Sequence, residues 1–61
     1  MGTVAKALEL LTLFTRLQPR IGLSEMARMS GTNKATCYRL LSELQAFGMV
    51  EQDDETRDYR L

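Results

Sequence analysis

The chain has 61 residues, of which 44% are hydrophobic and 26% are charged, and its eight basic and eight acidic side chains cancel at neutral pH. A chain of this length holds one small core and leaves no room for an elaborate catalytic cleft. No apolar run approaches the roughly 18 residues that a membrane span needs, and no signal-peptide layout is present. We therefore expect one cytoplasmic domain over residues 1–61 with no membrane partner.

The residue types needed for common metal and catalytic sites are missing. Cys37 is the single cysteine and there is no histidine, so no internal disulfide and none of the usual zinc-ligand sets can form. No nucleophile and base are spaced for contact, and there is no glycine-rich phosphate loop. We predict that the chain is not an enzyme and holds no metal or cofactor, and we assign Cys37 to the core.

The zero net charge hides an uneven distribution along the chain. Residues 1–42 carry six basic and two acidic side chains, whereas residues 43–61 carry two basic and six acidic ones. A basic N-terminal part suits contact with the phosphate backbone of DNA, although chance also produces such a split in a small protein.

The first predicted element is a helix over residues 3–17, with Thr3 in position to cap it. Leu10, Leu13 and Leu17 widen its apolar arc to about 200°, which is more than one packing face requires. Two interpretations follow. Either both flanks of the helix are buried in the core of the same chain, or these three leucines contact a second copy of the chain in a homodimer.

Pro19 ends this helix, and residues 21–23 are long enough only for a short strand. Ser24 is placed to cap a second helix, which ends by Ser30 ahead of Gly31. The residues of this helix that we expect to face the core are Leu23, Met26, Ala27 and Met29.

A third helix is predicted to begin at Thr32 or Asn33, either of which can cap it, and to run to Phe47, where Gly48 supplies a stop. Its predicted buried side consists of Cys37, Leu40, Leu41 and Leu44. Two short amphipathic helices separated by one glycine, over about residues 23–44, are typical of a helix-turn-helix.

After Gly48 the pattern changes to two predicted strands, residues 49–52 and 58–61, joined by a polar turn over residues 53–57. A hairpin directly after the recognition helix is a wing. The predicted fold class is therefore mainly α with a small β-hairpin, a winged helix-turn-helix of three helices plus a wing over about residues 49–61.

A recognition helix fits the major groove of double-stranded DNA and presents its N-terminal residues to base edges and phosphates. We expect Arg39 to reach a base edge or phosphate, Lys34 and Thr36 to make contacts at the helix start, and Tyr38 to bind phosphate through its hydroxyl. Ala35 suits a thymine methyl. The full set of predicted DNA-binding residues is Ser24, Thr32, Asn33, Lys34, Ala35, Thr36, Tyr38, Arg39 and Arg57.

Several of these roles have structural alternatives. Thr36 could return a hydrogen bond to its own helix cap, and Tyr38 could lay its ring on a neighbouring helix. Arg28 either adds positive potential for a phosphate or pairs with Glu25. Arg57 either enters a narrow minor groove from the wing tip or is held in an ion pair by its acidic neighbours.

The run S-G-T-N-K-A-T-C-Y-R-L-L-S-E-L-Q-A-F-G-M-V-E over residues 30–51 and the run D-D-E-T-R-D-Y-R-L over residues 53–61 resemble the winged helix-turn-helix of IclR-type bacterial transcription regulators. The most specific pieces are K-A-T-C-Y-R-L-L, the wing pattern D-x-E-T-x-x-Y-R-L, and the opening V-A-K-A-L-E-L-L. Thr32 departs from the resemblance, because an apolar residue more often follows the turn glycine.

The resemblance implies a regulator that binds a promoter palindrome as a homodimer or dimer of dimers, with helix one contributing to dimer contacts. It also implies a larger C-terminal domain that binds a small-molecule effector and that this chain does not contain. The alternative function is a winged helix used for protein contact or dimerisation without DNA binding, which should show apolar residues on the outward face of helix three.

Overall fold

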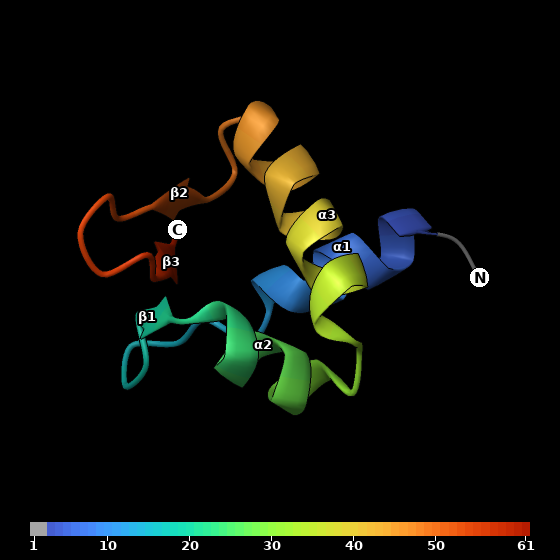
Figure 1. Ribbon diagram of the computed structural model, residues 1–61, viewed down its shortest axis with the longest axis horizontal. Coiled ribbons are helices and arrows are strands. Elements are labelled where there is room, and N and C mark those ends of the chain that lie inside the picture. The colour runs from blue at the N-terminus through green and yellow to red at the C-terminus, as the bar shows by residue number, and fades with distance from the viewer. Residues whose placement is uncertain (1–2) are drawn as a thin grey trace.

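The computed structural model describes residues 3–61, and within them it has three helices and three two-residue strands (Figure 1). In chain order the elements are α1 (Thr3–Leu11), β1 (Arg20–Ile21), α2 (Leu23–Ser30), α3 (Lys34–Ala46), β2 (Glu51–Gln52) and β3 (Tyr59–Arg60). This confirms the predicted fold class, a winged helix-turn-helix. None of the described helices is long and apolar enough to cross a membrane.

The strands form one antiparallel sheet in the order β1-β3-β2. Tyr59 in β3 stands between Ile21 on one side and Gln52 on the other. Strand β2 begins later than the predicted residue 49 because the chain leaves α3 through a tight turn, in which the Met49 N–H donates to the Leu44 carbonyl at 2.9 Å and is not available to a sheet ladder.

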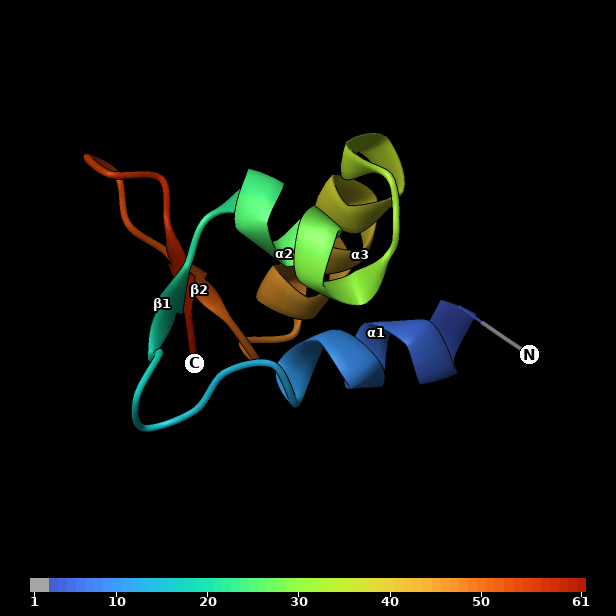
Figure 2. The ribbon, with the colours of Figure 1, turned by 90° about the horizontal axis from the view of Figure 1, so that it is seen from below.

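One small core lies between the helices and the sheet. Figure 2 shows α1 along one side of the molecule with α2 and α3 on the other, and the β2–β3 loop rising on the side of α2 and α3. The core combines the four predicted α3 residues with side chains from α1, α2, β1, β3 and two connecting segments, and its members are Ala7, Leu10, Phe14, Ile21, Met26, Ala27, Cys37, Leu40, Leu41, Leu44, Val50 and Tyr59. The helix-three prediction and the placement of Cys37 in the core are therefore confirmed.

Helix α1 ends at Leu11, six residues before its predicted end. Beyond it the chain tightens into turns, with the Thr12 N–H bonded to the Glu9 carbonyl, and the Thr12 hydroxyl donates to the same carbonyl at 2.6 Å. A hydroxyl that bonds a backbone carbonyl competes with the helix ladder, and the turns bring Phe14 back into the core. The predicted cap by Thr3 rests on a side chain outside the described residues.

The predicted cap of α2 was wrong. The helix begins two residues early, with Gly22 as N-cap and no side-chain cap bond, because the Met26 N–H already donates to the Gly22 carbonyl at 2.8 Å. This start places Leu23 against the core. Met29 was expected to face the core, but it lies at the surface while Met26 is fully buried, because the core-facing arc of this short helix is narrow.

Candidate nucleic-acid interface

The outward face of α3 carries four of the residues predicted to touch DNA. Lys34, Ala35, Tyr38 and Arg39 are exposed, on the side of the helix away from its buried leucines. In residues 3–61, neither Lys34 nor Arg39 lies within ion-pair distance of a carboxylate. These two positive charges therefore face solvent without a carboxylate in direct contact.

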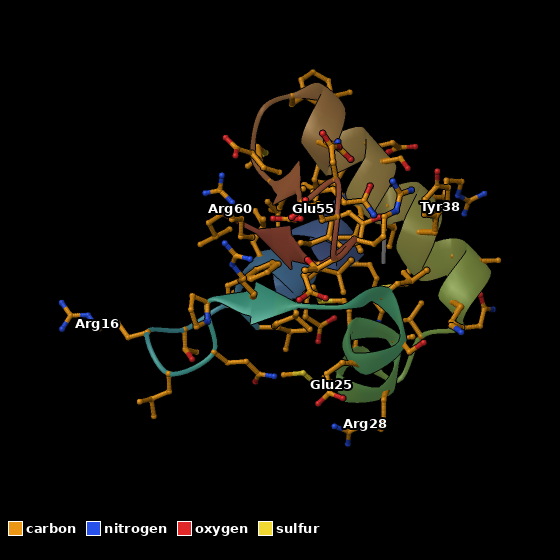
Figure 3. The ribbon with its side chains drawn as sticks, turned by 60° about the vertical axis from the view of Figure 1, so that its left-hand side comes forward. Arg16, Glu25, Arg28, Tyr38, Glu55 and Arg60 are labelled. Carbon is orange, nitrogen blue, oxygen red and sulfur yellow. The ribbon has the colours of Figure 1, made fainter. Side chains whose placement is uncertain are left out.

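Arg28 on α2 is held differently. Its guanidinium pairs with the Glu25 carboxylate one turn earlier on the same helix. Figure 3 shows these two side chains together on α2, well apart from Tyr38 on α3. Of the two alternatives for Arg28, the structure has the local ion pair.

The two residues between Gly31 and α3 have structural roles of their own. The Asn33 side-chain oxygen accepts the Thr36 backbone N–H at 2.8 Å, so Asn33 and not Thr32 is the cap of α3, and this bond occupies that oxygen. The Thr32 hydroxyl is enclosed and has no hydrogen-bond partner in the described residues, so it does not face outward as a DNA-binding group would. Thr36 is half-buried, on the flank of the outward face.

The wing turn is held by Asp53. Its carboxylate accepts the backbone N–H groups of Glu55 and Thr56 at 2.8 and 2.9 Å, and it lies 3.6 Å from the Arg20 guanidinium. These backbone hydrogen bonds, chiefly those from Thr56 and Glu55, lower the pKa of the Asp53 carboxyl, and Arg20 adds to the effect. One of the five acidic side chains in residues 49–61 is thus engaged inside the turn.

Arg57 lies just past this turn rather than at the tip where it was predicted, and its φ of +68° is in the left-handed region. A residue other than glycine pays a free-energy cost in the left-handed region, because its Cβ crowds the backbone. Arg57 is exposed, and no ion pair is found for it in the part of the chain that the structure describes. The alternative of a local ion pair is therefore not what the structure has.

A groove of about 530 Å³ runs between the start of α2, the outward face of α3 and the wing. It brings together four predicted residues, namely Ser24, Lys34, Tyr38 and Arg57. Gln52, Thr56 and Tyr59 are among the other lining residues, and none of these was predicted for the site from the sequence. The match of the wing pattern D-x-E-T-x-x-Y-R-L was the one signal that pointed to two of them, since strands of two residues give no readable alternation.

The chain was compared with known protein families, and a helix-turn-helix domain family matches it. The IclR helix-turn-helix domain matches residues 3–54. The chain belongs to the IclR helix-turn-helix family.

Curated relatives of this IclR-type domain are transcription regulators rather than enzymes. The chain is 32% identical over 59 residues to the HTH-type transcriptional regulator XynR of Escherichia coli K12, and 37% identical over 59 residues to the glycerol operon regulatory protein of Streptomyces coelicolor. Each alignment covers 97% of this chain and 23% of the relative, so the chain spans about a quarter of the length of these proteins.

Solved structures of IclR proteins share the fold. A protein from Silicibacter sp. TM1040 that is assigned to the IclR transcriptional regulators is 60% identical, with a TM-score of 0.94 over 98% of this chain and 24% of its own. An IclR family transcriptional regulator from Brucella abortus is 33% identical, with a TM-score of 0.95 over 100% of this chain and 23% of its own.

The IclR domain places the three leucines predicted for dimer contact in three different settings. Leu10 is fully buried in the core of its own chain and therefore offers no surface to a second copy, which corrects that prediction. Leu13 is partly buried against the same core. Leu17 is 98% exposed, on the loop after α1 from which Arg16 also projects (Figure 3).

A different apolar surface of this domain lies on the side of α1 and the end of α3. Val4, Leu8, Phe47 and Met49 are exposed there, and they border a hollow of about 180 Å³ whose lining also includes Ala7, Glu43 and Leu44. Val4, Leu8 and Phe47 were not assigned to any contact from the sequence, so this surface was not predicted.

Proposed function

We propose that this IclR domain binds double-stranded DNA sequence-specifically, with α3 in the major groove and the wing beside the backbone. The observation that supports it most directly is the outward face of α3, where Lys34 and Arg39 have no carboxylate partner in residues 3–61 while Arg28 on α2 does. Positive charge, a hydroxyl and a small apolar group on one helix face suit phosphates, base edges and a thymine methyl.

In this proposal Arg39 contacts a base edge or phosphate, Lys34 and Thr36 make contacts at the start of α3, and Tyr38 binds a phosphate through its hydroxyl. Ser24 binds a backbone phosphate from α2, and Arg57 reaches the minor groove. Neither Thr32 nor Asn33 reads DNA in this proposal, since the Thr32 hydroxyl is enclosed and the Asn33 amide oxygen caps α3.

The test is selection from a pool of random duplexes at two salt concentrations, followed by sequencing of the retained DNA. We expect enrichment of a common sequence whose binding weakens steeply with salt, because neutralised phosphates release counterions. Salt-sensitive retention without enrichment would contradict sequence specificity. No retention at low salt would contradict DNA binding and would favour a protein-contact module.

We also propose that the domain works as a homodimer or dimer of dimers on a palindrome, joined through the α1 and α3 surface described above. A two-fold interface needs a surface that is complementary to itself. Phe47, 83% exposed, stands beside an apolar hollow on the same face, so each copy offers both a projecting ring and a recess. Half-sites one helical turn apart would then follow.

Sedimentation equilibrium with two matched variants tests this interface. Phe47→Ser is expected to weaken self-association, whereas Leu17→Ser, which removes an equally exposed apolar side chain from a different surface, should leave it unchanged. The opposite result would assign the contact to Leu17, one of the three leucines predicted from the sequence to contact a second copy. A strict monomer at high concentration for the unaltered chain would remove the dimer proposal for this domain.

The remaining parts of this regulator are proposals as well. We expect the domain to act in the cytoplasm, and we expect a small-molecule effector to act through a part of the longer relatives that this chain does not span. Fusion of the chain to that part of a relative would test effector control, since effector-dependent binding should appear only in the fusion.

A further inference from the structure

The start of α2 presents backbone donors to the groove between α2, α3 and the wing. The first helical bond of α2 is the one from the Met26 N–H, and Gly22 brings no side-chain cap. The N–H groups of Ser24 and Glu25 therefore have no protein partner among residues 3–61. Unpaired amides at a helix start favour an anion.

The Tyr59 side chain gives an independent indication of a ligand at the same place. Tyr59 is 1% exposed, lines the groove, and its hydroxyl forms no hydrogen bond with the described residues. In this part of the chain Thr32 Oγ1 is the one fully enclosed side-chain polar atom without a partner, so the unbonded Tyr59 hydroxyl must meet solvent. Because the rest of the ring is packed in the core, that opening is the groove.

The Tyr59 hydroxyl is suited to donate. Burial raises the pKa of this phenol, and nearby Tyr38 raises it further against a lowering by Arg57, so it keeps its proton at neutral pH. A hydroxyl that opens only onto the groove can donate to water or to an acceptor bound there, and a charged acceptor forms the stronger hydrogen bond.

Four charged side chains line the groove. Lys34 and Arg57 are positive, whereas Glu25 is already paired with Arg28. Asp58 is the remaining negative group, and its Oδ1 would lie 3.1 Å from a Cβ on Gly22, which places it beside the start of α2. Asp58 therefore opposes an anion that the other groups attract.

We propose that this groove holds one backbone phosphate of bound DNA, and that the Tyr59 hydroxyl and the Ser24 and Glu25 amides are donors to it. The inference rests on the proposed function and adds a phosphate contact from Tyr59 in strand β3. Because every nucleotide carries a phosphate, this contact raises affinity for all duplexes alike and fixes how the wing sits on the backbone.

Fluorescence anisotropy with two labelled duplexes, one of random sequence and one selected from the pool, tests the proposal. Tyr59→Phe keeps the ring in the core and removes one hydroxyl, and we expect about ten-fold weaker binding to both duplexes, a typical loss for a hydrogen bond to a charged group. Thr12→Val is the matched control, since it removes a hydroxyl from outside the groove and should change neither affinity.

Asp58→Asn provides a second variant that does not disturb the core. It removes the negative charge that faces the phosphate, and we expect several-fold tighter binding to both duplexes. Thermal unfolding of each variant establishes that it is folded at the assay temperature.

The outcomes separate this inference from the proposed function. Equal affinity of the unaltered chain for the two duplexes, with Tyr59→Phe still weaker, would support the phosphate site and contradict sequence specificity. Discrimination between the duplexes with no effect of Tyr59→Phe or Asp58→Asn would overturn the phosphate site alone. Loss of binding to one duplex only would also overturn it, because a phosphate contact does not depend on base sequence.

Discussion

Helix α3 and the three-stranded sheet differ in how their basic side chains are engaged. On α3 the two basic groups, Lys34 and Arg39, have no carboxylate partner in the described residues. On the sheet Arg20 pairs with Asp53 and Arg60 pairs with Glu51. A surface that binds a polyanion keeps its cations available, whereas a small sheet of two-residue strands uses its charges to hold its own turns and edges.

The two regions also differ in what fixes their backbone. Helix α3 has 13 residues, a side-chain cap and a continuous buried face. Its local sequence therefore determines which residues face the core and which face outward. The wing depends on one carboxylate that bonds two turn amides and on Arg57 in a left-handed conformation. Substitutions in α3 should therefore separate core from binding surface, whereas substitutions in the wing should change both together.

The largest effect is expected for Leu44→Ala on the buried side of α3. Leu44 packs in the core, and truncation of a buried leucine lowers the free energy of unfolding by about 2–5 kcal/mol. Urea unfolding followed by circular dichroism measures it. Leu17→Ala removes the same atoms from a fully exposed leucine and should stay near zero, and a similar loss in both would mean that the core has been misassigned.

Arg39→Ala on the opposite side of α3 should spare stability and weaken binding. We expect a loss of about 1–3 kcal/mol in the free energy of binding to the selected duplex, the range for an arginine that contacts a base. Binding titrations at fixed salt provide the measurement. Arg28→Ala removes an arginine that is paired on α2 and should cost much less, so equal losses would indicate a general charge effect rather than a specific contact.

How far the sequence predicts this molecule follows the same division between helix and wing. The buried stripe and the outward face of α3 were both predicted, because a period of 3.6 residues over 13 residues defines two sides. The end of α1 was not, since a competing bond from the Thr12 hydroxyl and the packing of Phe14 decide it.

The groove could be predicted only in part. Ser24, Lys34, Tyr38 and Arg57 were named from the sequence, but Tyr59 was not. Whether a strand side chain points to the core or to a groove depends on the register of the sheet. Strands of two residues carry too little pattern to fix that register in advance.

Thr32→Val at the start of α3 should stabilise the domain. The Thr32 hydroxyl is enclosed without a partner, and an apolar group of the same shape removes its desolvation cost, for an expected gain of about 1 kcal/mol. Thermal unfolding measures the gain, and DNA affinity should not change because the hydroxyl does not face outward. Lower affinity without a change in stability would return Thr32 to the DNA-binding surface.

Arg57→Gly tests whether the wing holds strain for the sake of binding. Glycine removes the cost of a side chain at positive φ but adds flexibility to the unfolded chain, so we expect a net stabilisation of about 0.5 kcal/mol. DNA affinity should fall at the same time. Arg57→Ala removes the same charge and keeps the strain, so it should lose affinity without gaining stability. Unchanged affinity in both variants would leave Arg57 without a role in binding.

The smallest expected effect is the pH dependence contributed by Asp53 in the wing turn. Its pKa is lowered in the folded chain below the ordinary value of 3.8, mainly by the N–H groups of Thr56 and Glu55, so the folded state favours the ionised carboxylate. A lowered folded pKa contributes stability that is complete above the unfolded pKa and is lost as pH falls through the folded value.

Urea unfolding of the unaltered chain and of Asp53→Asn, at pH values from about 5 to about 2, measures this contribution. The variant lacks the titrating group and should lose stability less steeply with acid, although it starts from a lower value because an amide oxygen is a weaker acceptor for the two turn N–H groups. If the stability of both proteins fell equally with decreasing pH, the ionised Asp53 carboxylate would not contribute to the stability of the wing turn.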